Sequence, residues 1–111
     1  MSNDNEFRKQ AVEIIGNCVC KERNEAYGSV EENFSNIADL WTWWLKKRGM
    51  LSVAAPELTV LDVAQMIAFI KIARKLNDIE YLDNWIDDAG YNACGAAEIL
   101  RKQHKVEAEM T

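Results

Sequence analysis

Charged residues lie within the most apolar stretch of the chain. Asp62, Lys71 and Arg74 fall within residues 60–76, where almost every other side chain is aliphatic, aromatic or alanine. A buried carboxylate or ammonium group destabilises a fold unless it is paired or bound to a ligand. Two interpretations follow. In the first, Asp62 caps a helix, and Lys71 and Arg74 reach outward or pair with acids of a neighbouring helix. In the second, the three residues belong to a functional site.

Carboxylates elsewhere in the chain are candidates to join Asp62 in a cation site. The group comprises Glu31, Glu32, Asp39, Asp62, Asp83, Asp87 and Asp88. Asp83 and Asp87 are one helical turn apart and therefore share a face. Oxygen ligands from facing helices hold hard cations such as magnesium, often together with water and substrate phosphates. The alternative is a solvated acidic surface, which we expect for Glu31 and Asp88 in particular.

Several other chemistries are excluded by the composition and the motifs. A net charge of −5 argues against nucleic-acid binding, because no basic stripe is present to displace counterions. The single histidine, His104, has no serine or cysteine partner suggested by the sequence. No glycine-rich phosphate loop precedes a helix. Three cysteines are an odd number, and we expect reduced thiols rather than disulfides.

The elements that position these residues are expected to be long helices joined by short turns. Only one proline interrupts the chain, and no alternating strand pattern occurs. Ser29 with Glu32, and Thr59 with Asp62, have the spacing of helix N-terminal capping boxes. The predicted helices cover residues 5–25, 29–49, 60–76 and 79–105.

These helices predict an all-α fold in a single domain spanning residues 1–111. The core covers about residues 5–100, and residues 101–111 form a polar, frayed tail. The third helix is apolar on nearly every face, so we expect neighbours on most of its sides. The fourth is rich in alanine and glycine and lets another backbone approach closely. A second copy of the chain is a candidate to complete the core, and no segment reaches the length of a membrane span.

Several spaced blocks, in order, resemble a known group of proteins over about residues 8–100. The blocks are Arg23-x-x-x-Tyr27-Gly28, Asn33-Phe34-x-x-Ile37-Ala38-x-Leu40-Trp41, Leu61-Asp62-Val63-Ala64, Lys71-Ile72-Ala73-Arg74 and Trp85-x-Asp87-x-Ala89-Gly90-Tyr91. The series is similar to a family of small phage and prophage proteins of unassigned function. That family resembles the MazG-like all-α nucleotide pyrophosphohydrolases.

The resemblance implies a four-helix MazG-like bundle that assembles as a homodimer or homotetramer. MazG-like enzymes split nucleoside triphosphates into monophosphate and pyrophosphate with magnesium. Their signature places Glu-Glu-x-x-Glu on one helix and Glu-x-x-Asp on the next. The corresponding segments here are Glu31-Glu32-x-x-Ser35 and Thr59-x-x-Asp62, so Ser35 and Thr59 stand where the family has acids.

The resemblance carries over Glu31, Glu32 and Asp62 as acids of the signature, and together with the other charged and polar residues above it gives three groups of candidate site residues. The metal ligands are Glu31, Glu32, Asp62 and Asp83, and the catalytic residues are Glu32, Asp62 and Lys71, the last as a phosphate contact. The substrate-binding residues are Arg23, Tyr27, Asn33, Arg74, Asp87 and Tyr91. Trp43 points away from the apolar stripe of its helix and is a candidate for a base-stacking pocket or a dimer interface.

Three functions remain in view. The first is magnesium-dependent hydrolysis of a nucleoside triphosphate or modified nucleotide in the cytoplasm of a bacterial host. The second is nucleotide binding or sequestration without hydrolysis, which the missing acids favour. The third is a structural helical oligomer in which the buried charges only pair with one another.

Overall fold

The computed structural model describes residues 2–22 and 29–110, and within these ranges every regular element is a helix. The elements are α1 (Ser2–Asn17), the π-helical turn η1 (Cys18–Glu22), α3 (Val30–Lys47), α4 (Val60–Asn77) and α5 (Leu82–Met110). No strand occurs in the described residues. The all-α prediction is confirmed.

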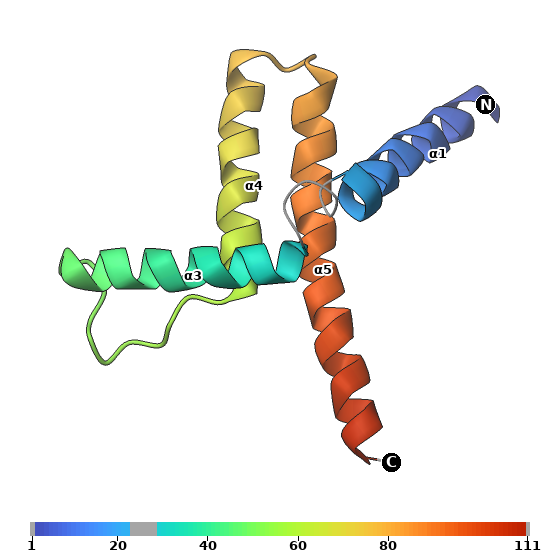
Figure 1. Cartoon of the computed structure of the whole chain (residues 1–111). Helices are drawn as coiled ribbons and strands as arrows, with labels where there is room; N and C mark the ends of the chain where they lie inside the picture. Colours follow the sequence, from blue (N-terminus) through green and yellow to red (C-terminus); the bar gives the residue numbers. More distant parts are fainter. Residues whose placement is uncertain (1, 23–28, 111) are drawn as a thin grey trace.

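Helices α4 and α5 form an antiparallel hairpin that is the centre of the molecule (Figure 1). Helix α3 lies across the hairpin near the start of α4, and α1 projects away from α5. The last turns of α5 extend beyond the other helices. A side chain on α4 is therefore positioned by α3 at one end of the hairpin and by α5 along its length.

The starts of α3 and α4 are set by the capping residues that the sequence indicates. The Ser29 hydroxyl accepts a hydrogen bond from the Glu32 amide at 3.1 Å. At α4 the box is complete, because the Thr59 side chain accepts from the Asp62 amide while the Asp62 carboxylate accepts from the Thr59 amide. These contacts satisfy amides that have no partner within the helix. After α3, Gly49 takes a φ of 72°, a conformation that disfavours other residues.

The core lies where α3 meets the hairpin. Its buried members are Phe34, Ala38, Val63, Ala64, Ala68, Tyr91 and Cys94. Small residues of α5 allow close packing, as predicted: a Cβ built on Gly95 would lie 3.7 Å from the Ala64 Cβ, and one on Gly90 only 3.1 Å from the Val19 Cγ2. The partners of this small-residue face are thus α4 and η1 of the same chain.

Several predicted helix boundaries differ from the structure, at the ends of the first and fourth helices above all. The first helix does not run regularly to residue 25, because the α-helical pattern of α1 gives way to a π-helical turn after Asn17. The fourth helix begins at Leu82 rather than at residue 79 and extends to Met110, beyond the predicted end at residue 105. Residues 102–110 contain no proline or glycine, so nothing in their composition breaks the helix.

The predicted surroundings of the third helix are also wrong for the single chain. Val63, Ala64 and Ala68 are buried in α4, but Phe69 and Leu76 on its other face are 57% and 86% exposed. The radius of gyration is 16.8 Å, against about 13 Å for a compact domain of this length. Helices α3 and α5 cover only one side of α4, so a closed four-helix bundle is not confirmed.

Candidate functional site

Two ion pairs join α4 to α5 and form a cluster that we call the polar seam, made of Lys71, Lys75, Asp87 and Asp88. The Lys71 Nζ lies 3.1 Å from the Asp87 Oδ2, and the Lys75 Nζ lies 2.7 Å from the Asp88 Oδ2. Both lysine side chains are less than 15% exposed. For Lys71 the interpretation as a pair with an acid of a neighbouring helix is confirmed. For Asp88 the expectation of a solvated surface is wrong, because the helix packing brings Lys75 onto it.

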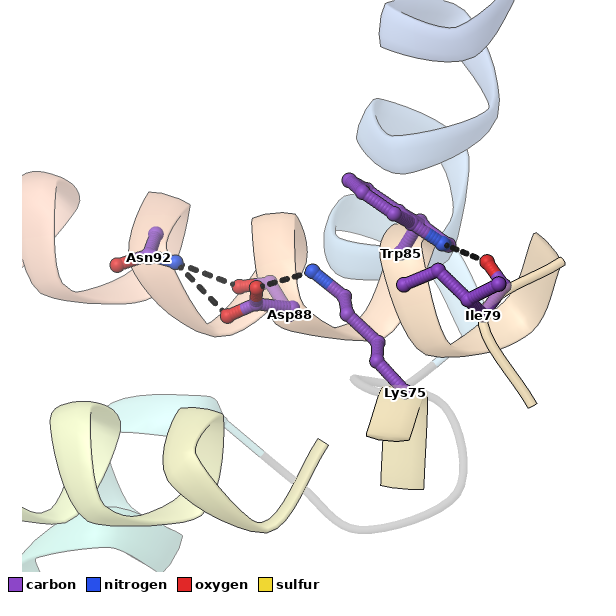
Figure 2. A network of polar contacts seen from close by, with 5 residues as sticks. All are labelled: Lys75, Ile79, Trp85, Asp88 and Asn92. Carbon is purple, nitrogen blue, oxygen red and sulfur yellow. Dashed lines mark hydrogen bonds and ion pairs between the residues drawn. The ribbon is translucent and has the colours of Figure 1, made fainter. Parts of the chain in front are cut away.

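The Lys75 half of the polar seam is a tightly connected network (Figure 2). The Lys75 ammonium lies 4.0 Å from the centroid of the Trp85 ring, which adds a cation–π contact to its ion pair. The Asn92 side-chain amide donates to the Asp88 Oδ1 at 3.1 Å, and the Trp85 indole N–H donates to the Ile79 carbonyl at 2.8 Å. Each charged group here has several partners, which indicates a structural role for this half of the polar seam.

The Lys71 half of the polar seam, Lys71 with Asp87, is more open than the Lys75 half. Two other predicted site residues, Arg74 and Asp83, lie within one helical turn of its members. Asp87 is 31% exposed, about twice as much as Asp88. Arg74 follows Lys71 by one turn of α4 and is exposed, with no ion pair to any described residue. Asp83 precedes Asp87 by one turn of α5 and accepts a hydrogen bond from the Tyr81 hydroxyl at 3.2 Å. The cations named here therefore lie on α4 and the acids on α5.

The carboxylates predicted to bind magnesium are not brought together within one chain. Asp62 starts α4 and Asp83 starts α5 at the other end of the hairpin, roughly 22 Å along the helix axis. Glu31 and Glu32 are exposed at the start of α3. The described residues contain no group of three or more metal-ligating side chains. These four acids therefore do not fit a magnesium site in a single chain.

Asp62 has a structural task that the sequence already allowed. Its Oδ2 accepts hydrogen bonds from the Thr59 amide at 2.8 Å and from the Thr59 hydroxyl at 3.1 Å. A carboxylate in the first turn also interacts favourably with the helix dipole. Capping thus accounts for the charge of Asp62 at the start of an apolar helix.

The remaining predicted substrate residues are spread over the fold. Tyr91 is 8% exposed and its ring stacks on Phe34 with the centroids 6.1 Å apart. A ring held in the core in this way does not present a face to a ligand. Asn33 is exposed on α3. Arg23 and Tyr27 lie outside the described residues.

A buried acid that the sequence reasoning missed lies further along α5. The Glu98 side chain is 4% exposed, and Arg101 donates to its two oxygens at 2.6 and 3.0 Å. The hydrogen bonds from Arg101 hold the pKa of the Glu98 carboxyl below its ordinary value, although burial acts in the opposite direction. The three-residue spacing of the pair within a helix was the available signal. Because both oxygens are engaged, we assign Glu98 a structural role.

A pocket of about 560 Å³ lies between α3 and the segment that follows it. It is lined by Asp39, Thr42, Trp43, Lys46, Lys47, Val53 and Glu57. Two polar contacts hold its wall: Thr42 accepts from the Leu58 amide at 2.9 Å, and Lys46 donates to the Val53 carbonyl at 3.1 Å. The volume is in the range of small-molecule sites. The placement of Trp43 in this wall, with 57% of the residue exposed, is compatible with the predicted base-stacking role.

No helix in the described part of the chain is both long enough and apolar enough to cross a lipid bilayer.

Comparison with known proteins identifies the family. A family described as a domain of unknown function, DUF6378, matches residues 10–99. The Gene 55 protein of Mycobacterium phage D29 is 37% identical over 73 residues, which cover 66% of this chain and 42% of that protein. The Gene 55 protein of Mycobacterium phage L5 is 36% identical over 88 residues, covering 79% of this chain and 48% of that protein.

These relatives support the predicted resemblance to a small phage family of unassigned function. The chain spans about half the length of the curated relatives it matches. No solved structure matches it. Since the family match covers most of the sequence, the chain belongs to the DUF6378 family.

Proposed function

We propose that the protein binds the phosphate groups of a nucleoside triphosphate, or of a related modified nucleotide, at the Lys71 half of the polar seam. The observation that carries the proposal is the 3.1 Å contact between Lys71 and Asp87, a predicted phosphate ligand and a predicted substrate residue from different helices. The protein acts as a homodimer or homotetramer in the cytoplasm of the bacterial host.

Two cations at this site, Lys71 and Arg74, are suited to meeting an anionic ligand. Lys71 is largely shielded from water, which strengthens its interaction with any nearby charge. Its carboxylate partner is the more exposed member of the pair, so a phosphate oxygen can take its place. Arg74 offers an exposed guanidinium one turn away, and arginine is suited to binding two phosphate oxygens at once. A rival interpretation is that the pair only fastens α4 to α5.

Calorimetric titration with a panel of ribo- and deoxyribonucleoside triphosphates, with and without magnesium, tests the proposal. At least one nucleotide should bind, and K71Q and R74Q should each weaken that binding about tenfold or more, the loss expected for a charge-assisted hydrogen bond. The matched control is K102Q, which removes an exposed cation elsewhere on α5 and should bind normally. No binding by the native protein, or equal binding by all four proteins, would overturn it.

Hydrolysis of the bound nucleotide to monophosphate and pyrophosphate is a second candidate function. It is favoured by Asp83 and Asp87, which are one turn apart on α5, and by the pairing of Asp87 with Lys71. Magnesium often uses one or two protein carboxylates together with substrate phosphates. When bound, the metal would offset the charge that develops on the phosphates during cleavage.

The two candidates give different products in the same experiment. Pyrophosphate release that requires magnesium and is lost in D87N would establish hydrolysis. A nucleotide that binds and is recovered chemically unchanged would leave binding as the function. The engagement of Asp62 in a helix cap favours binding, because it removes one acid from the predicted metal set.

A further inference from the structure

Helix α4 carries a second apolar face that no described element covers. We call it the outer face and define it by Met66, Phe69, Ala73 and Leu76. These residues lie opposite the side of α4 that packs on α3 and α5. Met66, Phe69 and Leu76 are 38%, 57% and 86% exposed. A contiguous apolar face of this kind on a helix marks a surface for association.

The total surface of the chain shows how much area is left uncovered. The accessible surface is 8463 Å², whereas a folded monomer of 12.7 kDa exposes about 6,200 Å². The excess is about 2,200 Å². Obligate homodimers bury about 1,000 to 2,500 Å² on each subunit. This excess is summed over the whole open arrangement of helices, including α1 and the end of α5, and it is large enough to include one stable, self-associating interface.

The spacing on the outer face fits another helix of the same kind. Its members follow one another by three, four and three residues, the pattern of the a and d positions in paired helices. A two-fold axis through the middle of this face makes the two helices antiparallel. Phe69 then meets Ala73 of the partner subunit, and Met66 meets Leu76 of the partner subunit. At the centre of the pair Phe69 faces the small Ala73 of the partner subunit, which fills space better than a parallel pair, where Phe69 would meet its own copy.

We infer that the outer face of α4 is a homodimer interface, in which α4 packs antiparallel against α4 of a second copy. The inference specifies the assembly that the proposed function invokes. It requires no nucleotide, and its test measures only mass, so a failure here would leave nucleotide binding by the single chain standing. Other exposed apolar residues are spread over α1, α3, the segment between α3 and α4, the turn before α5, and α5 itself.

Sedimentation equilibrium at micromolar concentration, without ligand, tests the interface. The native protein should have twice the 12.7 kDa mass of the chain. F69E should be monomeric, because it places two carboxylates in the middle of the interface. V106E is the matched control, because Val106 is 54% exposed, a fraction similar to that of Phe69, but lies near the end of α5. A monomeric native protein, or a dimer that survives F69E, would overturn the inference.

A charge exchange tests the antiparallel register. M66E and L76K should each weaken the dimer, since each sets a charge against an apolar side chain. In the antiparallel pair the double variant M66E/L76K places the new glutamate of one subunit beside the new lysine of the other, and dimerisation should recover. The two positions are ten residues apart in α4, too far to pair within one chain. A double variant weaker than both single variants would refute the register.

Discussion

Replacing Phe34 with alanine should severely destabilise the protein, because this ring links α3 to the hairpin. Phe34 is 1% exposed and stacks on Tyr91 of α5. It also belongs to the cluster formed with residues of α4. Removing it takes away apolar contacts with both hairpin helices and leaves a cavity that the surrounding helices can only partly fill.

The expected loss in the free energy of unfolding is about 3 to 5 kcal/mol. Part of this loss is the ring contact with Tyr91, which contributes about 0.5 to 1.5 kcal/mol beyond the burial of area. Domains of this size have about 5 to 15 kcal/mol in total. The melting temperature should fall by about 20 °C, at about 5 °C per kcal/mol.

Urea unfolding followed by far-ultraviolet circular dichroism measures this change. Phe7→Ala is the matched control, because it makes the same substitution at a ring that is 66% exposed, and it should cost about 0.5 kcal/mol or less. All proteins must be compared at one concentration, since self-association stabilises the folded state. A loss of less than about 1 kcal/mol in F34A, or an equal loss in both variants, would refute the placement of Phe34 in the core.

Two further predictions concern other parts of the fold. Because the pKa of the Glu98 carboxyl is lowered, its ion pair stabilises the fold at pH values above the ordinary pKa of 4.5, and this contribution is lost as the pH falls through the folded-state pKa. The difference in unfolding free energy between the native protein and E98Q should therefore shrink from pH 7 to pH 3. A difference that stays constant over this range would contradict the prediction. Gly90→Val should lower the free energy of unfolding by about 1 to 3 kcal/mol, because the new side chain overpacks against Val19. Gly16→Ala, where nothing lies within 4 Å of the added Cβ, should raise it by about 0.5 to 1 kcal/mol. Thermal unfolding that ranks these two variants in the opposite order would refute the close approach of η1 to α5.

The candidate site shows how far residue types can be interpreted without a structure. Of the charges singled out in the apolar helix, Lys71 has a partner in Asp87 and Asp62 caps the helix, whereas Arg74 is exposed and has no ion pair to any described residue. The partner of Asp88 was missed, because pairing between helices depends on how two faces are rotated against each other. Glu98 was missed for a related reason: only the packing around α5 makes this acid buried.

The sequence by itself determined the helical class, the starts of α3 and α4 and the turn at Gly49. Each of these rests on contacts within a few residues, such as the box between Thr59 and Asp62, so local chemistry suffices. The tertiary structure alone decided that α3 lies across the hairpin and that the predicted metal ligands are far apart. It also decided that one apolar face of α4 is left uncovered. These features depend on contacts between distant segments, and an apolar helix looks the same in sequence whether its second face meets its own chain or another.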